Sequence, residues 1–141
     1  MNIQFFSIYQ GTFTLTQRNK LKKFISKQLT REGYNVESLN YIFCSDDYLL
    51  KVNRDYLKHD YYTDIITFEL SDVKDRIQGE VYISIDRVKD NARQSGSFQY
   101  QELHRVIFHG ALHLSGYKDK TQKQSKEMRN KEDEYLNAYF Q

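Results

Sequence analysis

The sequence predicts an α+β fold, a small mixed β-sheet of about four strands covered by about five helices. Runs of β-branched and aromatic residues, which favour strands, occur in the first 85 positions. Segments with apolar residues at helical spacing lie between some of these runs and fill the rest of the chain. Two of these runs follow each other without a helix between them, which predicts an antiparallel pair. No linker or repeat interrupts the 141 residues, so we expect a single domain over residues 1–141. The expected strands span residues 3–9, 39–44, 65–70 and 79–85.

Caps and glycine stops place two helices in the amino-terminal half. Thr14 or Thr16 is expected to cap the first helix, whose apolar stripe ends at Gly33. Ser45 is expected to cap the second, because two aspartates follow it where negative charge favours a helix start. That helix should end before a polar loop at residues 58–62.

Three more helices are expected after the last strand. A short helix starts at Asp86 and ends at Gly96, where glycine accepts the left-handed conformation that closes a helix. Ser97 caps a longer helix, which Gly116 closes. A final amphipathic helix starts near Thr121, and its mixed charges predict a solvated face rather than an RNA-binding arm.

Composition restricts the function only loosely. The 21 Lys and Arg residues nearly balance the 19 Asp and Glu residues, and a net charge of +2 gives no strong field for a polyanion. Nucleic-acid binding is therefore neither demanded nor excluded. No apolar run approaches the ~20 residues of a membrane span, so no membrane partner is expected. The single cysteine, Cys44, cannot form an internal disulfide, and the first residues lack a secretory signal, which predicts a cytoplasmic protein.

The chemistry of the chain is concentrated in residues 108–120, FHGALHLSGYKDK. His109 and His113 are four residues apart, so on a helix their side chains rise from one face and can bind one metal ion. Gly116 can end the helix and turn the chain back, which returns Asp119 towards the two imidazoles. The spacing repeats that of the zincin motif HExxHxxGxxH, with aspartate as the third ligand. Two imidazoles and one carboxylate leave an open position, as in a catalytic zinc site.

The histidines of this chain also have interpretations other than metal binding. A histidine pair at this spacing also occurs as ordinary surface or core residues, and the added glycine and aspartate favour the metal. His104 falls off the face of the pair and His59 lies far away in the sequence, so neither is expected to be a ligand. In HExxH peptidases the residue after the first histidine is the general base, a glutamate, and here it is Gly110. Gly110 therefore opposes a minimal zinc peptidase.

The string HGALHLSGY in the same segment resembles the signature HGxLHLxGYDH of the YbeY family, bacterial endoribonucleases of rRNA maturation. Two further blocks agree in order and spacing. Residues 53–68, NRDYLKHDYYTDIITF, are similar to the family's block that ends in TDVLSF, and residues 79–84, GEVYIS, are similar to its GDI.IS. The resemblance covers about two-thirds of the chain and includes the whole metal motif.

The resemblance implies an activity, a cofactor and partners. It implies a single-strand-specific endoribonuclease that uses one Zn²⁺ per chain and acts in 16S rRNA 3′-end maturation and ribosome quality control. It assigns the metal to His109, His113 and Asp119, where the family usually has three histidines. The implied partner is the single-stranded 16S rRNA precursor, with ribosomal proteins or the small ribosomal subunit as further candidates. A non-catalytic rRNA-binding or ribosome-assembly factor with a structural metal is the alternative.

One position departs from the family in a way that matters for catalysis. The family's arginine, which implies phosphate binding or transition-state stabilisation, falls on Leu57 and so favours the non-catalytic alternative. Lys58 or Arg54 becomes the candidate catalytic cation, although lysine lacks the bidentate fork of arginine. Arg105, one helical turn before the first histidine of the pair, is a candidate for substrate binding, together with Lys58 and Asp64.

Several polar and aromatic residues also have simpler interpretations. Asp64 directly precedes a strand, where aspartate is more often a turn or cap residue. Ser84 and Glu80 lie on the polar face of an alternating strand and are expected to be solvent or groove positions. Tyr61 and Tyr62 can stack on unpaired bases, but packing explains them equally well in a chain with 12 tyrosines.

Overall fold

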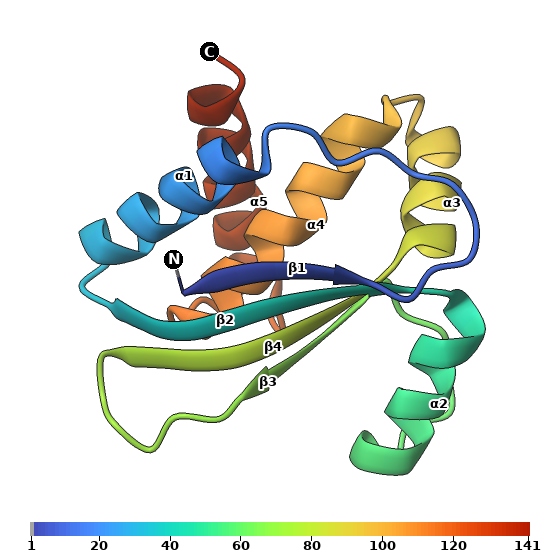
Figure 1. The fold of residues 1–141 in the computed structure, drawn as a ribbon, viewed down its shortest axis with the longest axis horizontal. Helices are drawn as coiled ribbons and strands as arrows, with labels where there is room; N and C mark the ends of the chain where they lie inside the picture. Colours follow the sequence, from blue (N-terminus) through green and yellow to red (C-terminus); the bar gives the residue numbers. More distant parts are fainter. Residues whose placement is uncertain (1) are drawn as a thin grey trace.

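The computed structural model describes residues 2–141, in which one four-stranded sheet is accompanied by five helices (Figure 1). The predicted α+β class is confirmed. Among residues 2–141, none of the helices combines the length and the hydropathy of a membrane span. The elements follow in the order β1 (Ile3–Ser7), α1 (Arg18–Arg31), β2 (Asn35–Cys44), α2 (Asp46–Leu57), β3 (Ile65–Glu69), β4 (Arg76–Ser84), α3 (Ile85–Ser95), α4 (Gln99–Leu114) and α5 (Gln122–Tyr139).

β2 and β4 form the centre of the sheet, whose strand order is β1-β2-β4-β3. β1 and β4 each pair with β2 in parallel. β3 pairs with β4 in an antiparallel ladder in which Ile65 lies opposite Ile83, and this confirms the predicted antiparallel pair. The two central strands begin earlier than expected, because Asn35 of β2 already lies opposite Arg76 of β4.

Two apolar cores of different size lie on opposite faces of the sheet. In Figure 1, α1, α4 and α5 cover one face, and α2 lies on the other side. The larger core joins Val81 of β4 to Phe108 of α4 and Tyr135 of α5. The smaller core joins Leu49 of α2 to Ile66 of β3. The helix that carries the histidine pair is therefore held between the sheet and two other helices.

α4 and the sheet approach closely at two glycines. A Cβ added at Gly110 of α4 would lie 2.8 Å from Cγ1 of Val81 and 3.1 Å from Cδ1 of Ile65. A Cβ added at Gly79 of β4 would lie 3.0 Å from both Cδ atoms of Leu114 of α4. Each element thus carries a glycine where the other presents a branched side chain. Larger residues at these positions would push the helix away from the sheet.

The expected start of α1 is wrong. Neither Thr14 nor Thr16 caps the helix, which begins after Gln17 in a left-handed conformation with φ 54°. Leu15, between the two threonines, is buried in the larger core. Burial of this side chain fixes the path of the chain before the helix, so helical geometry begins two residues after Thr16.

The other helix caps are partly as expected. Ser45 and Thr121 cap α2 and α5 through hydrogen bonds that their side chains accept, which confirms both predictions. Ser97 does not cap α4, whose N-cap is Phe98. The Ser97 amide instead donates to the carbonyl oxygen of Ala92 at 3.0 Å, so this residue closes α3 and comes one position too early for α4.

Ser84 is not the solvent or groove position expected from strand alternation. Its side chain is fully buried, donates to Oδ1 of Asp46 at 2.6 Å and accepts from the amide of Arg87 at 3.1 Å. It caps α3, which begins at Ile85, one residue earlier than expected. Its amide donates to the carbonyl oxygen of Asp64 at 2.9 Å. Ser84 therefore joins the end of β4 to α2, to α3 and to the segment before β3.

Candidate metal centre

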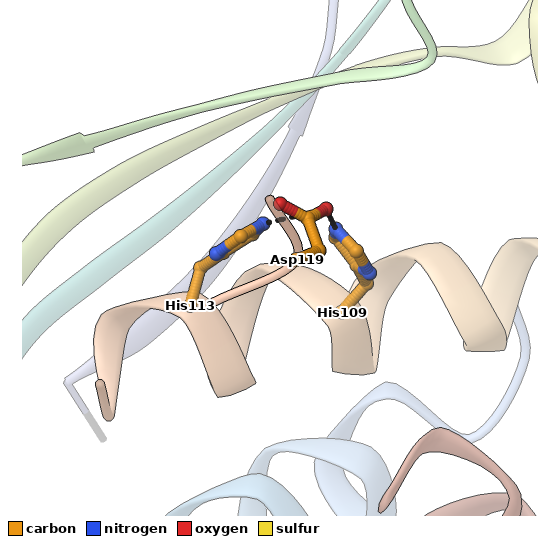
Figure 2. A group of neighbouring side chains, drawn as sticks. All are labelled: His109, His113 and Asp119. Atoms are coloured by element: carbon orange, nitrogen blue, oxygen red, sulfur yellow. Dashed lines mark ion pairs between the residues drawn. The ribbon is translucent and has the colours of Figure 1, made fainter. Parts of the chain in front are cut away.

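Two histidine side chains rise from one face of α4, with an aspartate side chain between them (Figure 2). Nε2 of His109 lies 3.3 Å from Oδ2 of Asp119, and Nε2 of His113 lies 3.4 Å from the same oxygen. One ligand atom from each residue lies within 4.8 Å of the other two. The structure therefore brings together the three residues that the sequence predicts as ligands.

A tight turn after α4 returns Asp119 to the helix. Gly116 has φ 98°, in the left-handed region that residues with a side chain rarely adopt. The amide of Tyr117 donates to the carbonyl oxygen of Leu112 at 3.0 Å and closes the helix end. Oγ of Ser125, in the first turn of α5, donates to the carbonyl oxygen of Asp119 at 2.9 Å. The loop that carries the aspartate is thus fixed at both ends.

The second nitrogen of each imidazole contacts a different kind of group. Nδ1 of His113 donates to the carbonyl oxygen of Tyr117 at 3.0 Å, in the turn after the helix. Nδ1 of His109 donates to Oε2 of Glu132 at 2.6 Å, on α5. With a proton on Nδ1, a neutral ring presents its Nε2 lone pair towards Asp119. Two imidazole nitrogens and a carboxylate oxygen fit a zinc ion, and three protein ligands leave one position open.

The two imidazoles differ in their affinity for protons. Burial disfavours the charged form of both rings. At His109 the hydrogen bond and charge of Glu132, aided by the charges of Asp64 and Asp119, outweigh burial and raise the pKa. At His113 burial and the neighbouring charge of His109 lower the pKa. One helix face therefore carries two chemically unlike histidines.

A cavity of about 550 Å³ opens beside His109. Side chains of α3, α4 and α5 form most of its wall, and the loop after α4 and the residue before β3 complete it. Its charged lining residues are Asp64, Glu102, Arg105, Asp119, Arg129 and Glu132. Carboxylates and guanidinium groups therefore share one space with an imidazole of the candidate metal centre.

Two of the predicted substrate-binding residues line this cavity. Nη1 of Arg105 lies 3.0 Å from Oε1 of Glu132, and its Nη2 lies 2.8 Å from Oδ1 of Asp133. Burial raises the pKa of the Asp64 carboxyl group, against the opposing charge of His109. Asp64 is thus both a residue of the turn before β3, as the simpler interpretation expects, and part of the cavity wall.

The predicted cations of α2 do not line the cavity. Lys58 ends the helix in a left-handed conformation with φ 58°, and its Nζ donates to the carbonyl oxygen of Asp55 at 3.2 Å. Arg54 forms an exposed ion pair with Asp60. Leu57, where the family has arginine, is 39% exposed. All three residues lie in the last turn of α2 or directly after it, and none of them lines the cavity beside His109.

The two other histidines of the described chain have partners of their own. His59 lies in the exposed loop after α2, and its ring stacks on Tyr61 with centroids 5.2 Å apart. His104 is buried and stacks on Tyr139 with centroids 5.3 Å apart. Neither belongs to the group formed around Asp119, as the sequence predicts.

The final helix supplies two charged residues to the cavity wall that the motif does not contain, Glu132 and Arg129. Glu132 is only 5% exposed, so the expectation of a solvated charged face is wrong for this position. The signal was its spacing, because Glu132 follows Met128 by four residues and precedes Tyr135 by three, inside the apolar stripe of α5. Arg129 also lines the cavity, and its side chain is 62% exposed.

Known proteins are similar in sequence to this chain along most of its length. The model of the family described as Endoribonuclease YbeY matches residues 7–140. The chain belongs to the YbeY family. Endoribonuclease YbeY of Cytophaga hutchinsonii is 54% identical over 132 residues, which cover 94% of this chain and 92% of that protein. Endoribonuclease YbeY of Porphyromonas gingivalis is 46% identical over 120 residues, which cover 85% and 79%. The resemblance found in the sequence motifs is confirmed.

The fold of this YbeY chain also occurs in a solved structure. The solution structure of TM1509 from Thermotoga maritima is similar to this chain with a TM-score of 0.65 and 29% sequence identity, over 98% of this chain and 89% of that one. In this YbeY chain the position of a peptidase's general base is Gly110, and a Cβ there would meet Val81 at 2.8 Å. The peptidase alternative is therefore opposed by packing as well as by sequence.

Proposed function

We propose that this chain is a zinc-dependent, single-strand-specific endoribonuclease of the cytoplasm that acts in 16S rRNA 3′-end maturation and in ribosome quality control. The observation that carries the proposal is the arrangement of His109, His113 and Asp119 beside a charged cavity, in a chain whose family consists of endoribonucleases. An endoribonuclease is a hydrolase of RNA phosphodiester bonds, so RNA is the expected partner. The 16S rRNA precursor and the small ribosomal subunit are the proposed source of that RNA.

One zinc ion per chain is the proposed cofactor. His109 and His113 would hold it through Nε2, and Asp119 through a carboxylate oxygen, because these atoms already face one another. When bound, zinc acts as a Lewis acid on a phosphoryl oxygen or on water. The contribution of the protein is to keep the two lone pairs and the carboxylate aimed at one point, which the hydrogen bonds at both Nδ1 atoms do.

RNA phosphates need cations near this point. Arg129 is the most available, because it lines the cavity, is 62% exposed and has its Glu132 partner 3.6 Å away. Arg105 offers a second guanidinium, which is already paired with two carboxylates. Lys58 and Arg54 lie outside the cavity wall, and we propose them as contacts for phosphates of a strand that extends beyond it.

Asp64 can bind the substrate from the other side of the cavity. Because burial raises its pKa, its carboxyl group holds a proton at a higher pH than an exposed aspartate does. Its place in the cavity wall lets the carboxyl group accept hydrogen bonds from hydroxyl and amino groups of RNA. We therefore propose Asp64 as a substrate-binding residue beside the metal centre.

Metal analysis and RNA cleavage test the proposal together. The wild type and the variants His109→Ala, His113→Ala and Asp119→Ala would be prepared without a metal-binding tag and analysed for zinc by elemental analysis. We expect about one zinc per wild-type chain, with zinc and cleavage of single-stranded RNA lost or strongly reduced in each variant. A wild type that holds no stoichiometric metal after zinc is added would contradict the hydrolase mechanism.

Leu57 favours a second candidate function, a non-catalytic rRNA-binding or ribosome-assembly factor with a structural metal. The position that carries the family's arginine has no charge in this chain, and the nearby Lys58 and Arg54 already have polar partners. Under this alternative the zinc-loaded protein would bind a defined RNA without cutting it. Cleavage that depends on His113 would exclude the alternative.

A further inference from the structure

Glu132 is the buried acid closest to the candidate metal centre, and it is not one of the ligands. Its Oε2 accepts from Nδ1 of His109 at 2.6 Å, whereas the ligand nitrogen of that ring is Nε2. The imidazole therefore stands between the glutamate and the position of the metal. The group of potential ligand atoms accordingly contains His109, His113 and Asp119 without Glu132.

Both carboxylate oxygens of Glu132 are used. Oε2 accepts from His109, and Oε1 lies 3.0 Å from Nη1 of Arg105. The second Nη of Arg105 is fixed by Asp133, the next residue along α5, at 2.8 Å. A charge-assisted hydrogen bond on each side defines the position of the carboxylate in two directions. Arg105, Glu132 and His109 thus form a chain of contacts that ends at a metal-facing nitrogen.

The apolar environment of Glu132 argues against a role in packing alone. It lies in the apolar stripe of α5 between Met128 and Tyr135, both buried, and is itself only 5% exposed. Placing a carboxylate in such a site costs free energy that its partners must offset, and an apolar residue would pack there without that cost. The hydrogen bond to His109 gives the charge a function.

We propose that Glu132 is a positioning residue of the metal centre, which holds His109 with its proton on Nδ1 and its Nε2 lone pair directed at Asp119. This proposal rests on the proposed metal site. Its chemistry is that of a carboxylate behind a ligating histidine, which fixes the tautomer and the ring orientation and increases the basicity of the ligand. Arg105 acts one step further back by holding Glu132.

The test is zinc affinity, measured by competition with a chromophoric chelator. Glu132→Ala removes the acceptor, and Glu132→Gln keeps the shape and an acceptor oxygen but removes the charge. Glu127→Gln, at an exposed position of the same helix, is the matched control. We expect the zinc dissociation constant to rise by ~10- to 100-fold in the alanine variant, by less in the glutamine variant, and not in the control. Circular dichroism and thermal unfolding of the metal-free proteins separate this effect from misfolding.

A second measurement reports directly which nitrogen of the His109 ring carries the proton. Long-range proton–nitrogen spectra of the metal-free protein, at a pH where both histidines are neutral, should place the His109 proton on Nδ1 in the wild type. In Glu132→Ala the two tautomers of His109 should mix, while His113 stays unchanged. Unchanged zinc affinity and an unchanged tautomer in Glu132→Ala would overturn the proposal.

The outcomes distinguish this role from the proposed function. Zinc binding that is weakened by Glu132→Ala in a protein that cuts no RNA would support the positioning role and contradict the nuclease. Zinc-dependent cleavage with affinity independent of Glu132 would do the reverse. A wild type that binds no zinc would overturn both the metal centre and the positioning role.

Discussion

His109 and His113 face the same aspartate from the same helix, yet their second nitrogens contact very different parts of the chain. His113 is held by the carbonyl oxygen of Tyr117, four residues later in the turn that ends α4. His109 is held by the side chain of Glu132, 23 residues later on α5. One contact forms as soon as the helix ends, whereas the other requires α5 to dock. The candidate metal centre therefore depends on one contact that is local in the sequence and on one tertiary contact.

The largest expected effect on stability comes from weakening the packing of α5, the helix that carries Glu132. Met128→Ala removes a side chain that is 2% exposed in the larger core, so we expect the free energy of unfolding to fall by about 2–5 kcal/mol. Because the docking of α5 positions Glu132, zinc affinity should fall as well. Chemical denaturation and chelator competition measure the two quantities.

Leu29→Ala in α1 is the matched control for this prediction. Leu29 is also fully buried in the larger core, so a similar loss of stability is expected, but α1 carries none of the residues around Asp119. Zinc affinity should then be retained as long as the protein is folded. Equal loss of zinc affinity in the Met128 and Leu29 variants would show that the metal centre does not depend on α5 in particular.

A smaller effect on stability is expected from a substitution in the turn after α4, which supplies the local contact to His113. Gly116→Ala places a side chain at φ 98° and should cost about 1–2 kcal/mol of stability. The strained turn carries both the Tyr117 carbonyl group and Asp119, so zinc affinity should decrease too. Gly33→Ala, at φ 92° and with no atom within 4 Å of the new Cβ, should cost similar stability and leave zinc affinity unchanged. Thermal unfolding and zinc titration of both variants decide whether the turn matters for the metal.

The smallest effect is a difference between the two rings in the metal-free protein. His109 should titrate above the ordinary histidine pKa, because Glu132 outweighs burial, and His113 below it, because burial and the charge of His109 act together. Because the pKa of His109 is higher in the folded protein than in the unfolded chain, protonation of this ring adds to the free energy of unfolding at low pH. This contribution is lost as the pH rises through the pKa of His109 in the folded protein. Proton NMR titration of the imidazoles measures both. Titration of the two rings at the same pH would contradict the asymmetry.

The sequence predicts those features that depend on neighbouring residues. The antiparallel β3–β4 pair follows from two strand segments without a helix between them, and the caps Ser45 and Thr121 lie directly before their helices. The approach of Asp119 to His109 and His113 likewise follows from helical periodicity and a glycine turn.

The features that the sequence did not predict depend on tertiary contacts. Leu15 is buried in the larger core, to which distant parts of the chain contribute, and α1 begins only at Arg18, beyond the expected caps. Strand alternation places Ser84 on the solvent side, but contacts with α2 and α3 bury it. Glu132 reads as one of many charges in a helix, because its partner His109 lies on another helix. Sequence periodicity predicts which face of a helix or strand is buried, but it does not predict which residues of other elements contact that face.

The paired glycines between α4 and β4 limit which new activities could evolve on this scaffold. A glutamate at position 110 would supply the base of an HExxH peptidase, but its Cβ would first meet Val81 at 2.8 Å. Conversion would therefore require at least a second, compensating reduction of the side chain on β4. Each change alone would be harmful, since the first overpacks the interface and the second leaves a void. Because of the short distance between α4 and β4, a single mutation at position 110 would not convert the candidate metal centre into that of an HExxH peptidase.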